Sequence, residues 1–365
     1  MNVQKALNYS DIYLVPKYSE LESRSQADIS VSFLGRKFKS PWIPSNMESV
    51  LSIDNARWLS ENEYFYIMHR FGNNIRFIIQ ANHESWKLIS ISIGVKESDK
   101  ILIQNIQNSS LRVDVITIDI AHGDHILNIE MISFIKKTLP NVKIIAGNVC
   151  TVEALHRLAD AGADAVKVGI AGGGACSTKN MTGFHIPMFT CVQNCAGHNL
   201  GWIESPKGSR NLYSTQLPII ADGGVRENGD IAKALVAGAD MVMAGSMFAA
   251  CIDAPGENIY NDENINACVK LLMSPRSDNP LRYDDALAIA YKECKILKKK
   301  YHGSASAKQK GQKKNVEGFE IEIPCNGMTY SEKYQELAES LSSSISYAGG
   351  KDLKAFNSVN YITTK

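Results

Sequence analysis

Eight short apolar runs, most of them followed by a stretch with helical periodicity, constrain the fold of this chain more than any other feature. Apolar strands that alternate with helices indicate a parallel sheet covered on both faces, and eight such units are the number that closes a (β/α)8 TIM barrel. An open doubly wound sheet is the alternative. We predict strands at residues 42–44, 64–68, 88–93, 113–118, 142–146, 165–168, 218–221 and 241–244.

Polar or small residues follow the predicted strands, where a barrel of this kind carries its chemistry. For Arg70, Lys96 and Asn148 a structural role is equally open. The joint pattern favours a functional site at the carboxyl ends of the strands. Its members are Ser45, Asn46, Met47, His69, Arg70, Gly94, Lys96, Asp119, Ile120, Ala121, His122, Gly147, Asn148, Asp222, Gly223, Gly224, Gly245 and Ser246.

The loop after the sixth predicted strand joins three adjacent glycines, residues 172–174, to Cys176, Ser177 and Thr178. Adjacent glycines let backbone amides approach a phosphate or another ion closely, because no side chain blocks the way. A cysteine thiolate at such a site is a nucleophile. The alternative is that Cys176 is only a small buried apolar residue, a common fate of cysteine.

Two further strand ends suggest a nucleotide ligand. Asp222 offers a carboxylate that accepts hydrogen bonds from ribose hydroxyls, and the glycines beside it admit a close backbone approach. Gly245 and Ser246 follow the last predicted strand, where phosphate-binding loops of such barrels often lie. Capping of the next helix is the alternative role for Asp222. No GxGxxG motif follows an early strand, so a nicotinamide cofactor would lie across the barrel mouth.

Composition narrows the class of partner. The net charge is +1 over 365 residues, which argues against nucleic acid as a main partner. The amino terminus lacks the features of a signal peptide and no apolar run approaches about 18 residues, so we expect a soluble cytoplasmic protein with no membrane partner. Eight cysteines without a CxxC pair indicate reduced thiols. Cys191 and Cys195 are expected to face the core from one helix, since further metal ligands at a recognisable spacing are missing.

Three stretches extend what is otherwise a single barrel domain over residues 1–365. Insertions are predicted at about 197–216 and 258–300, the second with a helical stretch over 283–300. A lysine-rich segment at about 301–324, which includes an alternating run at 319–323, is predicted to be a flexible flap. Most of its lysines are expected to be solvated. Glu317 in this segment could serve as an acid or base brought over the barrel mouth.

Motifs along nearly the whole chain resemble the GMP reductases, within the larger family that also holds the IMP dehydrogenases. The sequence carries DIYLVP at 11–16, SRS at 23–25, IDIAHG at 118–123, AGN at 146–148, IADGG at 220–224, GDIAK at 229–233, GSAS at 303–306, NVEG at 315–318 and SISYAGG at 344–350. The resemblance implies a (β/α)8 barrel and a homotetramer. The implied reaction converts GMP to IMP and ammonia with NADPH, a step of purine nucleotide salvage.

The resemblance also assigns roles to residues. Cys176 falls on the nucleophile that adds to C2 of the purine and forms a thioimidate, and Thr178 with Glu317 falls on the pair that moves the proton for the leaving ammonia. Cofactor-binding positions are Asp119, Ile120, Ala121, Gly147 and Asn148. Substrate-binding positions are Ser45, Met47, Asp222, Gly224, Gly245, Ser246, Tyr301, Gly303, Ser304 and Gly318.

Two absences favour the reductase over the dehydrogenase within this resemblance. Dehydrogenases generally insert a regulatory domain of about a hundred residues after the second strand, whereas here the third predicted strand begins at residue 88. They also carry an Arg-Tyr pair in the flap, and residues 304–316 contain neither type. An IMP dehydrogenase without its regulatory domain, or a purine-nucleotide-binding protein without catalysis, remains the alternative.

The loop before the cysteine departs from the family pattern. Relatives usually show Gly-x-Gly-Pro-Gly, whereas this chain has Gly169-Ile-Ala-Gly-Gly. Carbonyls of this loop hold a potassium ion in relatives, so Gly173 and Cys176 are the candidate backbone ligands here. Ala171 tolerates fewer conformations than the glycine it replaces, and Gly172 is looser than proline.

Overall fold

A parallel sheet curled into a barrel forms the centre of the molecule. The computed structural model describes residues 5–72, 74–197, 217–273, 282–303 and 318–364. Seven parallel strands pair in the spatial order β4 (Trp42–Pro44), β10 (Met241–Ala244), β9 (Ile219–Asp222), β8 (Ala165–Val168), β7 (Lys143–Val149), β6 (Val115–Asp119) and β5 (Ser90–Ile93). This order, with each strand followed by a helix, confirms a TIM-barrel-like α/β fold.

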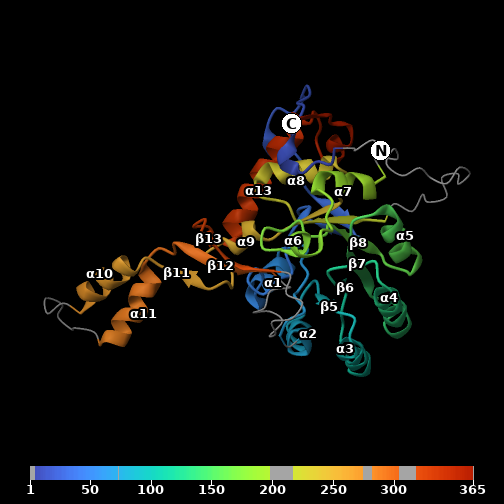
Figure 1. The fold of residues 1–365 in the computed structure, drawn as a ribbon. Helices are drawn as coiled ribbons and strands as arrows, with labels where there is room; N and C mark the ends of the chain where they lie inside the picture. Colours follow the sequence, from blue (N-terminus) through green and yellow to red (C-terminus); the bar gives the residue numbers. More distant parts are fainter. Residues whose placement is uncertain (1–4, 73, 198–216, 274–281, 304–317, 365) are drawn as a thin grey trace, which may run out of the picture.

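Helices cover the outside of the curled sheet (Figure 1). Those that follow the strands in turn are α1 (Ile53–Glu61), α2 (Asn74–His83), α3 (Glu97–Asn108), α4 (Ile126–Thr138), α5 (Val152–Asp160), α7 (Met188–Cys195), α8 (Asn228–Val236) and α13 (Tyr330–Tyr347). Cys191 and Cys195 are both buried on α7, as predicted. Among the described residues, no helix is long and apolar enough to cross a membrane.

The strand predicted at residues 64–68 is wrong, because this segment does not form a strand, although it is buried as a strand of the barrel would be. Phe65, Tyr66 and Ile67 are fully buried, yet the run pairs with the sheet through a single parallel bridge between Met68 and Ile91. The Met68 amide donates to the Ser90 carbonyl at 3.0 Å, and the Ser92 amide donates to the Met68 carbonyl at 2.8 Å. An apolar run reports burial and not backbone pairing, so the sequence could not separate the two.

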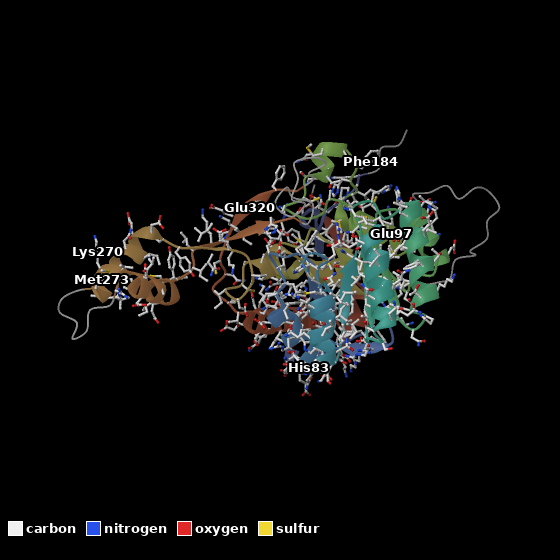
Figure 2. All side chains as sticks on the ribbon, turned by 90° about the horizontal axis from the view of Figure 1, so that it is seen from below. His83, Glu97, Phe184, Lys270, Met273 and Glu320 are labelled. Carbon is white, nitrogen blue, oxygen red and sulfur yellow. The ribbon has the colours of Figure 1, made fainter. Side chains whose placement is uncertain are left out.

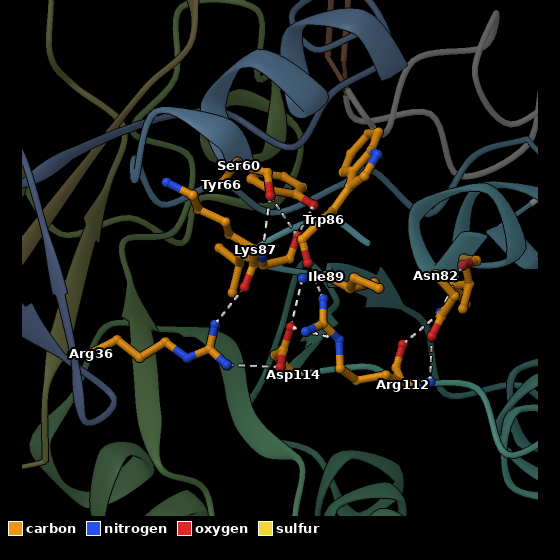
Figure 3. Close-up of polar contacts among 11 residues, drawn as sticks. Arg36, Ser60, Tyr66, Asn82, Trp86, Lys87, Ile89, Arg112 and Asp114 are labelled. Atoms are coloured by element: carbon orange, nitrogen blue, oxygen red, sulfur yellow. Dashed lines mark hydrogen bonds and ion pairs between the residues drawn. The ribbon is translucent and has the colours of Figure 1, made fainter. Parts of the chain in front are cut away.

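The amino-terminal ends of β5 and β6 are joined by a network of charged and polar groups (Figure 3). Asp114, just before β6, accepts the Ile89 amide at 2.7 Å through one oxygen. Its other oxygen accepts from Arg36 at 2.8 Å, and Arg36 also donates to the Lys87 carbonyl at 3.0 Å. Arg112 donates to the Trp86 carbonyl. These bonds fix the start of the two neighbouring strands at the end of the barrel opposite to the strand carboxyl ends.

Segments outside the barrel bring distant parts of the chain together. Near the termini β1 (Ile12–Leu14) pairs antiparallel with β14 (Tyr361–Thr363), and β2 (Val31–Phe33) forms a hairpin with β3 (Arg36–Phe38). Short helices complete the chain: η1 (Tyr9–Asp11), η2 (Arg24–Gln26), α6 (Thr178–Thr182), α9 (Ser246–Ala249) and η3 (Leu353–Ser358).

An arm projects from the barrel between β10 and α13. It contains β11 (Asn258–Ile259), α10 (Asp262–Leu272), α11 (Tyr283–Glu293), β12 (Lys298–His302) and β13 (Glu320–Pro324), and its tip near Lys270 and Met273 lies far from the barrel (Figures 1 and 2). The two helices share a small core of Ile265, Val269, Ala286 and Ala290. The predicted insertion at 258–300 falls within this arm. Residues 198–216, which make up nearly all of the other predicted insertion, lie outside the described part of the chain.

The helix predicted over 283–300 is wrong in its second half. It ends at Glu293, and residues Lys298–His302 instead form β12, which pairs antiparallel with β13. Burial alternates there, since Lys298 is exposed while Lys299 and Tyr301 are buried. A run of lysines favours a helix locally, but the pairing with β13 decides the conformation. Residues 301–303 of the predicted flexible flap therefore belong to a strand and its end.

Candidate active site

A cavity of ≈ 360 Å³ opens at the carboxyl ends of the barrel strands. It is lined by loops that follow β4, β6, β7, β8, β9 and β10, and by the end of β12. Most of the predicted site residues line it, among them Ser45, Asn46, Met47, Arg70, Asp119, Ile120, Ala121, Asn148, Gly173, Cys176, Thr178, Asp222, Gly223, Gly224, Gly245, Ser246, Tyr301 and Gly303. Strand ends that are far apart in the sequence thus meet at one mouth, as the barrel geometry requires.

Gly147 and Gly318 do not line this cavity, and neither do the predicted strand-end residues His69, Gly94, Lys96 and His122. Gly147 lies behind its wall, where a Cβ would come within 2.7 Å of the Cβ and the carbonyl oxygen of Lys167. Gly318 pairs with Cys176 through an antiparallel backbone bridge. Ser304 and Glu317 lie outside the described residues.

Cys176 stands at the wall of the cavity on a loop that is held on both sides. Its Sγ donates a hydrogen bond to Thr178 Oγ1 at 3.2 Å, and Thr178 is the first residue of α6. Next to it, the Ala175 carbonyl accepts the Phe319 amide at 2.9 Å. Together with the Cys176–Gly318 bridge, this bond lays the segment before β13 alongside the cysteine.

Glycines after β8 and β9 allow the two loops to lie close together. A Cβ on Gly223 would come within 2.9 Å of the Gly172 carbonyl carbon and the Gly173 nitrogen, and a Cβ on Gly169 would meet the Asp222 carbonyl oxygen. These glycines allow the loops after β8 and β9 to pack backbone against backbone. Of the three adjacent glycines 172–174, Gly173 and Gly174 have open space where a Cβ would lie, whereas a Cβ on Gly172 would meet Met188. Ala171 adopts φ 60°, a left-handed conformation that strains a residue with a side chain.

A buried lysine that sequence reasoning did not assign connects two walls of the cavity. Lys167 lies on β8 and its side chain is 2% exposed. Its Nζ lies 2.8 Å from Asp119 Oδ1 and 3.0 Å from Asp222 Oδ2, and it donates to Asn46 Oδ1 at 3.2 Å. The signal in the sequence is a charged residue inside the apolar run AVKV, since such a residue is buried only when it is paired.

The neighbours of the lysine are held in turn. Asn148, which follows a cis peptide bond after Gly147, donates through Nδ2 to Asp222 Oδ2 and to the Gly169 carbonyl, both at 2.8 Å. Burial works against ionisation of Asp119, but the Lys167 ammonium outweighs it and, with Arg70, lowers the pKa of that carboxyl. Asp119 is therefore ionised beside the Lys167 ammonium at neutral pH.

Tyr301 lines the cavity on the side where a phosphate is predicted to bind. It is 4% exposed, and its Oη contacts Met47 Sδ at 3.7 Å. Burial, with the charges of Asp222 and Cys176, raises the pKa of its phenol, so the hydroxyl keeps its proton and can donate. A Cβ on Gly245 would collide with this hydroxyl, which explains why glycine stands after β10.

No cluster of three or more His, Cys, Asp or Glu side chains that could hold a metal is found among the described residues. The Gly173 carbonyl accepts the Cys176 amide at 3.2 Å. A carbonyl oxygen has two lone pairs, so one remains for a cation. Potassium at Gly173 and Cys176 stays a prediction.

Comparison with known proteins agrees with this geometry. The model of the IMP dehydrogenase / GMP reductase domain matches residues 6–364. A protein named GMP reductase from Oenococcus oeni is 43% identical over 361 residues, which cover 98% of this chain and 97% of the relative. GMP reductases from Staphylococcus epidermidis, at 42% over 362 residues, and Staphylococcus aureus, at 40% over 364, match over 99% of this chain and 97% of their own length. The chain therefore belongs to the IMP dehydrogenase / GMP reductase family of oxidoreductases.

Proposed function

We propose that the protein catalyses the NADPH-dependent reductive deamination of GMP to IMP and ammonia through a covalent intermediate on Cys176. The observation that carries the proposal is the position of the Cys176 thiol at the cavity wall, 3.2 Å from the Thr178 hydroxyl and within one mouth that also contains Asp222 and Tyr301. The relatives that match over nearly their full length are named GMP reductases, which favours this direction over IMP oxidation.

The polar groups of the cavity suit a purine nucleotide monophosphate. Asp222 Oδ2 is engaged by Lys167 and Asn148, which leaves Oδ1 to accept a ribose hydroxyl. The backbone amides of Gly224, Gly245 and Ser246, with the Tyr301 hydroxyl, can donate to a phosphate. Ser45, Met47, Gly303, Ser304 and Gly318 are proposed to surround the rest of the substrate.

In the proposed chemistry the Cys176 sulfur forms a bond to C2 of the purine and the bond from C2 to the amino nitrogen breaks. Ammonia leaves with a proton that we assign to Thr178 and Glu317, and a thioimidate remains on the enzyme. The nicotinamide, when bound, supplies the hydride that C2 needs before the sulfur leaves and IMP is released. The overall balance is GMP, NADPH and one proton to IMP, NADP⁺ and ammonia.

The side of the mouth formed by β6 and β7 is the proposed cofactor side. Asp119, Ile120, Ala121 and Asn148 line it, while Gly147 supports it from behind. The polar edge of a carboxamide has partners there in an ionised carboxylate and in backbone groups. A homotetramer and a role in purine salvage complete the proposal and rest on the family resemblance alone.

A comparison of two assays tests the function. NADPH absorbance is followed with GMP, and NADH formation is followed with IMP and NAD⁺. We expect turnover in the first assay, and Cys176→Ala should abolish it. Turnover only with IMP and NAD⁺ would instead identify a dehydrogenase, and calorimetric binding of GMP without turnover in either assay would identify a binding protein.

The intermediate can be tested separately. Incubation of the protein with GMP in the absence of a reduced cofactor should release ammonia once per subunit and increase the intact mass by that of a purine nucleotide without its amino group. Cys176→Ala should show neither change, whereas a mass increase in that variant would place the adduct on another residue.

A further inference from the structure

We infer that Lys167 is a positioning residue that holds the substrate-side carboxylate of Asp222 and the cofactor-side carboxylate of Asp119 on one buried ammonium, so that both subsites depend on it. The inference rests on the proposed function. A lysine ammonium has three N–H donors, and Lys167 Nζ has three oxygen acceptors around it, on Asp119, Asp222 and Asn46. No donor remains for a ligand, so the role of Lys167 is to position its neighbours.

The position is built by residues on four strands or strand ends. Lys167 lies on β8, between β7 and β9 in the sheet, and contacts the last residues of β6 and β9. Asn46 reaches it from the loop after β4. A side chain at Gly147 of β7 would overlap the Lys167 backbone and Cβ, so glycine there lets the two strands approach. With a side chain that is 2% exposed, the ammonium is not free to move toward a ligand.

The charges explain why the ammonium is needed. Two carboxylates share one lysine, so the group carries a net charge of −1 before Arg70 is counted. Arg70, in the same cavity wall, also lowers the pKa of Asp119. Tyr301 is a protonated phenol near Asp222, since burial and that carboxylate raise its pKa. Burial, with Cys191, Asp230 and Asp222, likewise raises the pKa of Tyr9. Without Lys167, two carboxylates would face each other at low solvent exposure, and the pKa of one would rise.

This arrangement couples the two subsites. Asp222 uses Oδ2 for Lys167 and Asn148, which fixes the direction of Oδ1 toward the cavity. Asp119 uses Oδ1 for the same lysine. A single ammonium therefore holds both carboxylates in one orientation, which is preorganisation of the kind that binding sites require.

The test is Lys167→Met, which keeps the length of the side chain and removes the charge. In steady-state assays with GMP and NADPH, we expect KM to rise for both ligands. The rise should depend on pH, because the carboxylate with the raised pKa must lose its proton before it can accept. Below that raised pKa, the ratio of variant to wild-type KM should increase by about tenfold for each unit of pH decrease for the ligand that this carboxylate binds, GMP for Asp222 or the cofactor for Asp119. In the wild-type enzyme the pKa of Asp119 is lowered, so KM should show no such increase over the same pH range.

Lys299→Met is the matched control. Lys299 is the other fully buried lysine among the described residues, and its ammonium bonds only to carbonyls, at 2.6 Å for Ala254 and 3.3 Å for Ile252. Its removal should lower thermal stability without adding a pH-dependent KM. A second variant, Lys167→Met with Asp119→Asn, should no longer show the increase of KM at low pH, since the remaining carboxylate has no second negative charge beside it.

The outcomes separate the inference from the proposed function. If the wild-type protein does not convert GMP, the proposed function fails, and calorimetric binding of GMP at pH 6 and pH 8 then tests Lys167 alone. If the wild type is active and folded Lys167→Met shows the wild-type pH profile, or changes KM for one ligand only, the coupling role is overturned. A melting temperature measured for each variant shows whether it is folded.

Discussion

The two ends of the barrel both carry a cluster of cations around aspartates, but they are built in opposite ways. At the amino-terminal end, Asp114 alone receives Arg36, Arg112 and the Ile89 amide, and its arginines are 45% and 48% exposed. At the carboxyl end, Asp119 and Asp222 share the single lysine Lys167, whose side chain is 2% exposed. The first cluster has two exposed cations on one carboxylate, and the second has two carboxylates on one buried ammonium, with Arg70 in the same cavity wall.

The difference indicates what each end is for. Exposed ion pairs contribute little beyond the backbone groups they fix, so the amino-terminal cluster acts by holding β5 beside β6. A buried, undercompensated pair of carboxylates contributes little to folding and is retained for another reason. Ala171 at φ 60° and a buried His69 lie at this same end. A buried ammonium shared by two carboxylates therefore lies beside the cavity, and Ala171 adds a left-handed residue there, although Leu34, Glu63, Ser85 and Ser110 adopt positive φ elsewhere.

The largest effect at the carboxyl end of the barrel, on activity and not on stability, is expected from Cys176→Ala. We expect GMP reduction to fall by at least about 10⁴-fold, because covalent catalysis has no substitute once the nucleophile is removed. The melting temperature should stay within a few degrees of wild type, since the thiol is only partly buried and alanine creates little new space. Steady-state rates and a thermal melt check both parts. Residual activity within about a hundredfold of wild type would remove the cysteine from the chemistry.

The reverse pattern is expected at the other end for Asp114→Ala. The Ile89 amide loses its acceptor and Arg36 loses its carboxylate, so the free energy of unfolding should fall by about 1–3 kcal/mol. KM and kcat at 25 °C should remain close to wild type. Denaturant unfolding and the NADPH assay measure the two effects. Glu61→Ala, an exposed acid at the end of α1, is the control that should change neither. A large loss of kcat in folded Asp114→Ala would show that the two ends are not separable.

The sequence predicted the residues of the carboxyl end of the barrel better than those of the amino-terminal end. The strands at 42–44, 165–168 and 241–244 have the predicted bounds, because fully buried parallel strands are near-continuous apolar runs, interrupted here by Lys167. The cavity residues were found because chemistry collects at strand ends, which is a rule about topology. Asp114 and Lys167 were missed since each acts through a tertiary contact with a strand that is distant in sequence. The apolar run around Lys167 signals that its charge must be paired, but neither residue type nor spacing identifies the partner of either residue.

A smaller effect is expected from the pH dependence of stability at His69. This residue follows the second predicted strand, and burial lowers the pKa of its imidazole, so the folded protein favours the neutral ring. An unfolded histidine has a pKa of about 6.5. Stability should therefore be complete above that value and fall as pH decreases below it, by about 1 kcal/mol per unit until the ring is protonated in the folded state too. Folding free energies at pH 8 and pH 5.5 should differ less in His69→Gln than in wild type. An equal difference would assign the pH dependence to other groups.

The smallest expected effect is at Ala171, and its sign tests whether strain is present at the cavity end. Glycine removes the Cβ that opposes φ 60°, which is worth about 1–2 kcal/mol, and it adds about 0.5–1 kcal/mol of unfolded-chain entropy. Ala171→Gly should thus raise the free energy of unfolding by up to about 1 kcal/mol. Ala161→Gly is the matched control, because Ala161 caps α5 at φ −71°, so only the entropy term applies and stability should fall. If both variants lose stability equally, the loop holds no strain at Ala171, and the contrast between the two ends then rests on buried charge alone.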